Sequence, residues 1–497
     1  MKLLLPPTGE EWILFTLIFL ALGCFVVAAE LIRKKMQWSP EVTRKSVHIA
    51  VGVLIYFAPQ LFTSGIPAML LAIIFSLSNL IAIKMGLLKG MHGTNRRSYG
   101  TVYYPLSFLI LVILLWNSYS AIISIAILIL ALGDAGAAIV GEDLQHPHSY
   151  KLTSDKKTLE GSATMFIVTF LVTMLGLYFH PFARLVDHVL VLQTAIVAAF
   201  FVTAWEGISS RGFDNLTVPL SAAFVLHFML VGGPAHQPVD LMLGVAFGIG
   251  IAVASYYFHF LSISGSVATA LLATIVYGVG GWAWTLPILA FFIASSILSK
   301  MGKHRKQSFS LMFEKSDRRD AGQVAANGAL PGFLVLGWYL VPGWPLWSTV
   351  YLAVLAAVTA DTWGTEIGVL ARGRPRSILT FRSVETGTSG GVSLEGFAGG
   401  AVGALLIAIV GFKSMGMPMS LLALLRIIAA GVGGSLVDSL LGATVQAQYR
   451  CSVCGKTTER TLHCLQSASM IRGFGWIGND IVNWCCAISG AIIALLM

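Results

Sequence analysis

The chain has 497 residues, of which 56% are hydrophobic and only 11% are charged. Length alone would suggest about three soluble domains, but this composition is typical of a polytopic membrane protein. The formal net charge of +9 does not indicate nucleic-acid binding, because the sequence contains no basic soluble domain. We attribute the charge to membrane topology and to an anionic substrate.

Apolar stretches of 17–25 residues fill nearly every interval between polar loops, and each could cross a bilayer once as a helix. We therefore predict an all-α polytopic membrane protein with about sixteen transmembrane helices in two similar eight-helix halves. The first helix has no cationic segment before it and no cleavage site, so we expect it to be retained rather than removed as a signal peptide. The predicted helices lie near residues 11–32, 45–60, 65–84, 99–116, 120–141, 161–179, 189–206, 214–231, 239–257, 264–281, 283–300, 322–341, 347–370, 394–412, 419–446 and 474–497.

A Gly- and Pro-rich loop at residues 231–240 separates the two halves. We predict one membrane domain at 1–235 and a second at 236–497, the latter with a Cys/His loop at 451–464. Because both halves contain the same even number of predicted helices, we expect a parallel duplication rather than an inverted one.

Lysine and arginine residues are unevenly divided between the two faces that these helices define. With the N-terminus outside, the loops of one face hold 28 of the 32 Lys and Arg residues. Basic loops remain in the cytoplasm, so we predict that this face is cytoplasmic and that both termini are outside. His146 and Lys303 should then be cytoplasmic and Gly233 outside. No organellar transit peptide is recognisable, so we expect a bacterial plasma membrane.

The second predicted helix opens with Arg44, Lys45 and His48. Lys45 and His48 are three residues apart and therefore share one helical face. These residues could bind phosphate and provide a base, although basic anchoring at the membrane interface would also account for them.

One motif occurs in both halves. An apolar stretch brings Asp134 next to small residues, a basic loop follows, and the next apolar stretch opens on Leu-Glu-Gly at 159–161; the second half repeats this order after Asp361. A carboxylate at the end of a membrane helix is costly and is therefore a functional candidate. Lys156 and Lys157 offer cations for a phosphate chain, although a capped helix start beneath a basic loop has the same pattern.

Glu206, Asp214 and Asn215 flank a short cytoplasmic loop between the last two helices of the first half. Their oxygens, with those of the motif above, could hold Mg²⁺. A lone Asp-Asn pair at this position would instead be a helix cap.

Polar residues at the start of one second-half helix form a stripe that includes Arg318, Arg319, Gln323 and Asn327. A polar stripe on a membrane helix must face a cavity or a partner. The loop at 386–396 offers glycine-rich backbone N–H groups just before a helix begins, which is a favourable arrangement for binding an anion.

Acidic residues follow at the ends of second-half helices. Glu366 lies close to Asp361, and Asp438, Asn479 and Asp480 lie near the ends of the last two helices. These carboxylates resemble the first-half set in their positions, so we predict a second Mg²⁺ site.

Four residues of types that bind metals lie between the last two helices, namely Cys451, Cys454, His463 and Cys464. A CxxC pair with a His-Cys pair nine residues later could form a tetrahedral zinc site. The predicted cytoplasmic side disfavours a disulfide, and the remaining alternative is a set of free thiols.

These motifs resemble two related enzyme families. RKSVHIAVG, GDAGAAIVG, KKTLEGS and FDNLTVPL resemble the phytol/dolichol kinase branch of membrane CTP-using enzymes over about residues 40–230. RRDAGQVAANG, ADTWGTEIG, TGTSGGVSLEG, GGSLVDSLLGA and GNDIVNW resemble the phytyl-phosphate kinases over about residues 240–497. The first half departs from its family where Glu142 and its neighbours interrupt the usual basic, glycine-containing stretch, which leaves its nucleotide preference open.

The resemblance implies a fusion of two consecutive kinases, which would convert phytol or a similar prenyl alcohol to its monophosphate and then to its diphosphate. It implies CTP or another nucleoside triphosphate as co-substrate, Mg²⁺ as cofactor, and active sites at the cytoplasmic face. The predicted catalytic residues are His48, Asp134, Glu160, Glu206, Asp214, Asp361, Glu366, Asp438 and Asp480. The predicted nucleotide- or phosphate-binding residues are Arg44, Lys45, Lys156, Lys157, Asn215, Arg318, Arg319, Gln323, Asn327, Thr388, Ser389, Gly390, Gly391 and Asn479. The predicted Mg²⁺ ligands are Asp134, Asp214, Asp361, Asp438 and Asp480.

Two other functions would fit a duplicated membrane protein. A cytidylyltransferase that forms a CDP-lipid belongs to the same enzyme superfamily. A transporter with duplicated halves is the second alternative, but the carboxylates here cluster at helix ends rather than at the middle of the membrane.

Overall fold

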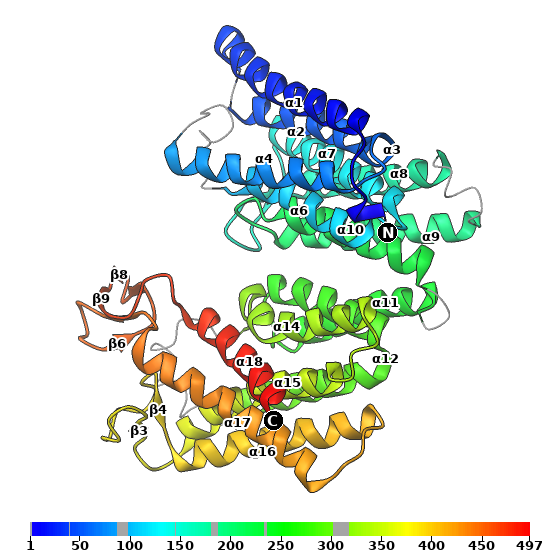
Figure 1. Ribbon diagram of the computed structural model, residues 1–497. Coiled ribbons are helices and arrows are strands. Elements are labelled where there is room, and N and C mark those ends of the chain that lie inside the picture. The colour runs from blue at the N-terminus through cyan, green and yellow to red at the C-terminus, as the bar shows by residue number, and fades with distance from the viewer. Residues whose placement is uncertain are drawn as a thin grey trace. The chain divides into compact units, whose positions relative to one another are not determined.

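The computed structural model describes residues 2–38, 40–86, 98–144, 146–179, 187–232, 236–301 and 318–497. Contacts between residues divide the chain into two compact units, Met1–Val239 and Asp240–Met497 (Figure 1). Eleven helices in the described ranges are long and apolar enough to cross a membrane, with Ile263–Lys300 counted as one. The predicted all-α membrane class is therefore confirmed, whereas the count of sixteen crossings stays a prediction. Gly233 and Lys303, which mark the predicted topology, lie outside the described residues.

Helix α7 (Ser120–Asp143) forms the centre of the first unit. Its residues from Ile122 to Leu130, apart from Leu128, are almost completely buried, and it packs against α2, α8 and α10. A helix that is apolar on all sides can be buried in this way. The other elements of this unit are η1 (Lys2–Leu4), α1 (Gly9–Met36), α2 (Pro40–Tyr56), α3 (Ala58–Leu61), α4 (Ile66–Met85), α6 (Gly100–Leu115), β1 (Ser149–Tyr150), β2 (Lys157–Thr158), α8 (Leu159–Phe179), α9 (His188–Ile208) and α10 (Asp214–Val231).

Helix α15 (Trp347–Leu370) has the corresponding place in the second unit. Its residues from Val350 to Ala360 are buried, and it packs against α14, α16, α17 and α18. The other elements of this unit are α11 (Pro238–Tyr257), α12 (Ile263–Lys300), α14 (Ala321–Leu340), β3 (Arg376–Ser377), β4 (Gly391–Val392), α16 (Leu394–Ser414), α17 (Leu421–Thr444), β5 (Gln448–Arg450), β6 (Thr457–Thr458), β7 (Leu462–His463), β8 (Gln466–Ser467), β9 (Ser469–Arg472) and α18 (Asn479–Leu496).

Helix α12 is two helices joined at a sharp turn. Gly281 has a φ of 57° and a ψ of −159°, which is not helical. The ammonium group of Lys300, at the end of α12, donates a 2.6 Å hydrogen bond to the carbonyl oxygen of Phe258, just before α12 begins. A straight helix of 38 residues would be about 57 Å long, so its ends could not meet. The chain therefore reverses at Gly281, in agreement with the two helices predicted at 264–281 and 283–300.

The repeated sequence motif forms the same local structure in both units. In the first, α7 is followed by an antiparallel hairpin of β1 and β2, in which Tyr150 pairs with Lys157, and then by α8. In the second, α15 is followed by a hairpin of β3 and β4, in which Ser377 pairs with Gly391, and then by α16. In this alignment of elements, α9 corresponds to α17 and α10 to α18.

A small β-rich segment separates α17 from α18 (Figure 1). It contains a three-stranded sheet in the order β6-β5-β9 and a hairpin of β7 and β8. We call residues 448–472 the Cys/His segment, because this part of the chain carries the predicted metal ligands.

Candidate functional site

In the first unit, Asp134 of α7 forms an ion pair with Lys45 of α2. The ammonium nitrogen of Lys45 lies 2.7 Å from Oδ2 of Asp134 and also donates to the Asp134 carbonyl oxygen at 3.2 Å. His48, one turn further along α2, has its Nε2 3.9 Å from the same carboxylate and stacks on the ring of Tyr104. Three predicted residues thus meet at one point of the first unit.

A second ion-pair group lies beside the first. Lys157 of β2 contacts the carboxylate of Glu206 at the end of α9, and its ammonium nitrogen is 3.3 Å from Oδ2 of Asp214 at the start of α10. Burial alone would lower the pKa of Lys157, but Asp214 and Glu206, with a smaller effect of Asp134, raise this pKa above its ordinary value. We therefore treat the two groups as parts of one charged site.

Arg44 and Asn215 meet at the start of α6. A Cβ atom added at Gly100 would lie 2.6 Å from a guanidinium nitrogen of Arg44 and 2.8 Å from the amide nitrogen of Asn215. The Asn215 side chain donates to the Gly212 carbonyl oxygen at 3.2 Å and to Asp214 at 3.0 Å. Its own oxygen is buried and has no hydrogen-bond partner among the described residues, and the same holds for Oε2 of Glu206. Both oxygens are available to a ligand or a metal.

Two predicted residues of this half lie elsewhere. The Lys156 side chain is exposed, whereas that of Lys157 points into the site. Glu160 accepts hydrogen bonds from the backbone N–H of His148 at 3.1 Å and contacts the His148 ring at 2.7 Å. In this structure the Glu160 carboxylate therefore bonds to the loop between α7 and α8, and it does not contribute to the ion pairs around Asp134.

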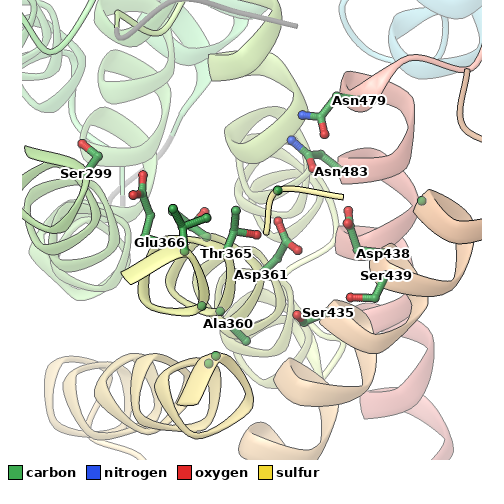
Figure 2. A pocket seen from close by; sticks show the side chains of 18 of the residues that line it. Ser299, Ala360, Asp361, Thr365, Glu366, Ser435, Asp438, Ser439, Asn479 and Asn483 are labelled. Carbon is green, nitrogen blue, oxygen red and sulfur yellow. The ribbon is translucent and has the colours of Figure 1, made fainter. Parts of the chain in front are cut away.

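The second unit contains a cavity of about 980 Å³ beside α15. Figure 2 shows the carboxyl groups of Asp361 and Asp438 close together in this cavity, with Glu366 on its other side. Asp361 and Asp438 are near enough to interact through a hydrogen bond. Oδ2 of Asp438 is buried without a hydrogen-bond partner in the described part of the chain. This pair of carboxylates could hold a divalent cation, because hard cations prefer oxygen ligands.

The predicted polar stripe lines the same cavity. Arg318, Arg319, Gln323 and Asn327 all contribute to its wall. Burial lowers the pKa of Arg319, an effect that Glu366 partly offsets. Gln323 also forms part of a helix cap, since its side chain accepts a 3.2 Å hydrogen bond from the backbone N–H of the residue before α14.

A second, apolar cavity of about 70 Å³ is also lined by residues of this stripe. Arg319, Gln323 and Asn327 line both cavities. The remaining wall of the smaller cavity is largely apolar and includes Phe247 and Leu272. A large cavity with polar and apolar walls and a small apolar cavity therefore share these residues in this unit.

The glycine-rich loop at 386–393 also lines the larger cavity. Gly390 has a φ of 80°, and a Cβ atom there would lie 2.4 Å from Cβ of Ala443 on α17. Only glycine fits this position without strain. Two of the predicted donors are already used, because the N–H groups of Thr388 and Gly391 bond to the carbonyl oxygens of Glu385 and Thr388. The loop thus offers fewer free backbone donors than the sequence suggested.

Of the two residues predicted at the start of α18, Asn479 is among the described residues that line the cavity, whereas Asp480 is not. Asn483, which was not predicted, also lines the cavity (Figure 2). Asn479 and Asn483 are four residues apart and so share one helical face, a spacing that could have identified Asn483. Other lining residues were missed by the sequence analysis, namely Ser299, Thr365, Ser435, Ser439, Gln446 and Glu459.

The two units differ in whether the hairpin places a cation beside the carboxylates. In the first, Lys157 of the hairpin lies between two acidic side chains. In the second, the hairpin position that corresponds to Lys157 is occupied by Gly391. An open cavity lies in this region of the second unit.

The Cys/His segment brings its four predicted metal ligands together. One ligand atom from each of Cys451, Cys454, His463 and Cys464 lies within 4.8 Å of all the others. Hydrogen bonds from the backbone, chiefly at Cys454, lower the pKa of Cys451 to about 6, whereas burial and the neighbouring sulfurs raise that of Cys464 to about 11. Two or more thiolates with one imidazole form the usual ligand set of structural zinc, so these residues fit that ion.

Known proteins resemble this chain in sequence. Residues 246–491 match the family described as integral membrane protein DUF92. The chain is similar to Protein PGR of Arabidopsis thaliana, with 33% identity over 266 residues that cover 49% of this chain and 91% of that protein. It is also similar to the phytol kinase of Synechocystis sp., with 34% identity over 222 residues that cover 44% of this chain and 93% of that protein.

The farnesol kinase of Arabidopsis thaliana is 30% identical over 208 residues, which cover 39% of this chain and 66% of that protein. No solved structure matches the chain. Because more than nine-tenths of Protein PGR and of the Synechocystis phytol kinase align with the chain at over 30% identity, the chain belongs to the families of these two proteins.

Proposed function

We propose that the chain is a membrane kinase for phytol or a similar prenyl alcohol, and that it carries out two consecutive phosphorylations. The first unit would form the monophosphate and the second the diphosphate, each with Mg²⁺ and CTP or another nucleoside triphosphate. The observation that carries the proposal is the repeated helix–hairpin–helix structure, which delivers Asp134 and Asp361 to polar sites in the two units. The names of the phytol kinase and farnesol kinase relatives support the substrate class.

In the first unit, phosphoryl transfer requires positioning and neutralisation of negative charge. Lys45, Lys157 and Arg44 supply cations around one site. Asp134 and Asp214 would hold Mg²⁺, which would neutralise charge on the phosphates. His48 lies 3.9 Å from Asp134 and could accept the proton of the attacking alcohol.

In the second unit, the nucleophile would be a phosphate oxygen. This oxygen is already anionic, so the site needs no strong base. Arg318 and Arg319 can neutralise phosphate charge, and Asp361 and Asp438 would hold Mg²⁺. The adjoining apolar cavity offers a place for the beginning of the hydrocarbon chain, while the phosphate occupies the larger cavity.

The proposed location follows from the distribution of charge. Basic loops are expected to face the cytoplasm, where nucleoside triphosphates are found. We therefore propose that both sites open toward the cytoplasm of a bacterial plasma membrane.

The test is a set of purified variants assayed separately for each step. Asp134→Asn should abolish formation of the monophosphate from phytol but still convert phytyl monophosphate to the diphosphate, and Asp361→Asn should do the reverse. Asp187→Asn is a matched control. Asp187 carries an exposed carboxylate just before the first residue of α9, whereas Glu206 of the site lies near the last residue of that helix. If either site variant loses both steps, the two-site proposal fails.

The label used in the assay separates kinase activity from the alternative of CDP-lipid formation. With γ-labelled CTP a kinase transfers label to the lipid, whereas with α-labelled CTP only a cytidylyltransferase does so. Label from the α position in the lipid product would contradict the kinase proposal.

A further inference from the structure

Glu459 reaches the larger cavity of the second unit from the Cys/His segment. Its Oε1 accepts a 2.8 Å hydrogen bond from the hydroxyl of Ser389 in the glycine-rich loop. The same oxygen accepts a 2.9 Å hydrogen bond from the amide of Gln446, just after α17. One carboxylate oxygen therefore connects the Cys/His segment, the glycine-rich loop and the end of α17.

In the sequence, Glu459 lies between candidate metal ligands, five residues after Cys454 and four before His463. It directly follows β6, which pairs with β5. Strands this short give little stability to an isolated sheet, so a cross-link between the ligands on either side would add to what fixes the position of Glu459.

The ligand atoms have the spacing that such a cross-link requires. Nδ1 of His463 lies 3.6 Å from Sγ of Cys454 and 3.2 Å from Sγ of Cys464. Zinc–ligand bonds of about 2.0–2.3 Å in a tetrahedron place ligand atoms about 3.5 Å apart. The His463 side chain is 6% exposed, and its Nε2 has no hydrogen-bond partner among the described residues. A buried imidazole that turns its other nitrogen toward two sulfurs is a suitable metal ligand.

We propose that a zinc ion bound by these four residues holds Glu459 in place, and that Glu459 in turn positions the glycine-rich loop at the phosphate end of the cavity. Glu459 is thus a positioning residue and acts through Ser389. Its effect on catalysis rests on the function proposed above, whereas its effect on the order of the loop does not.

Hydrogen–deuterium exchange of the purified full-length protein tests the effect on loop order. Glu459→Ala removes the acceptor of two hydrogen bonds and should accelerate exchange of residues 386–393 by about 10-fold. Glu459→Gln keeps a carbonyl oxygen that can accept both bonds, so it should restore most of the protection. Lys456→Ala, an exposed position in the same segment, is the control and should leave exchange of the loop unchanged.

Metal removal tests the role of the zinc ion. The protein should contain about one zinc per chain, and Cys454→Ser should lose it and accelerate exchange both in the loop and in the Cys/His segment. Chelation of the wild-type protein should have the same effect, and addition of Zn²⁺ alone should reverse it. Zinc-free protein with unchanged exchange at 386–393 would overturn the proposal, as would normal protection of the loop in Glu459→Ala.

Kinetics provide the second readout. In Glu459→Ala, the KM of the second phosphorylation for the nucleotide should rise more than kcat falls, because the loop is displaced but the acidic residues remain. Phosphorylation of phytol in the first unit is the internal reference. If the wild-type protein lacks the second phosphorylation altogether, the proposed function fails, but the exchange and metal measurements still decide the role of Glu459. Equal behaviour of Glu459→Gln and Glu459→Ala in exchange would contradict the positioning role of its oxygen.

Discussion

Replacement of Lys157 by methionine would leave two buried carboxylates next to each other without their cation. The ammonium nitrogen of Lys157 contacts Glu206 and lies 3.3 Å from Asp214. At that distance, and with an effective dielectric constant of about 20, each attraction amounts to roughly 5 kcal/mol before the cost of desolvation is subtracted. Removal of one partner from a buried ion pair typically destabilises a protein by about 3–5 kcal/mol.

The neighbouring lysine provides a matched control. Lys156→Met changes the same chemical group at an exposed position and should have little effect on stability. For a unit of this size, 1 kcal/mol corresponds to roughly 2–4 °C in Tm, so Lys157→Met should lower the transition of the first unit by roughly 6–20 °C. Thermal unfolding in detergent, followed by circular dichroism, measures this difference. The double variant Lys157→Met with Glu206→Gln should recover part of the lost Tm, because it removes one of the two carboxylates left without a cation.

The pH dependence follows from the raised pKa of Lys157. A cation whose pKa is higher in the folded state contributes its full stabilisation below its unfolded pKa of about 10.4, and loses it as the pH rises through the folded value. Titration of Lys157 should therefore not change the difference in Tm between the wild-type protein and Lys157→Met from pH 7 to 9. Equal Tm values for Lys157→Met and Lys156→Met would refute the reasoning, because they would show that the two carboxylates do not depend on the buried cation.

Two further predictions concern the glycine-rich loop and the topology. Gly390→Ala should lower the free energy of unfolding by roughly 2–4 kcal/mol through strain at positive φ and overpacking against α17, and it should impair the second phosphorylation. Gly373→Ala is the control and should do neither, because its added Cβ would meet no atom closer than 3.9 Å. Single cysteines at positions 146, 233 and 303 in a Cys-depleted protein, probed on intact cells with a membrane-impermeant thiol reagent, should react at 233 alone. Reaction at 303 without reaction at 146 would contradict the parallel duplication.

Helix positions were predictable from the sequence because the thickness of the bilayer fixes the length of each apolar stretch. The stretch at 214–231 coincides with α10 (Asp214–Val231), and the one at 120–141 lies within α7. Polar residues at the helix ends were likewise recognisable, since charge is costly within the membrane.

The arrangement of side chains within the sites was less predictable. Successive residues of a strand point to opposite sides, so the choice between Lys156 and Lys157 depends on the hairpin, in which Lys157 pairs with Tyr150. The contribution of Glu459 depends on contact with Ser389, 70 residues earlier in the chain. Contacts of this kind leave no periodic signal in the sequence.

The reversal at Gly281 has a consequence for the insertion of the protein into the membrane. The two arms of α12 are joined by a single non-helical residue, and the adjacent Trp282 is half exposed, as expected for a side chain at the lipid–water boundary. Two crossings with almost no connecting loop should leave the translocon together as a helical hairpin. Insertion of one residue within the second arm, after Trp282 and before Ser296, would rotate the rest of that arm by about 100° and turn Ser296, Ser299 and Lys300 away from the cavity that they line.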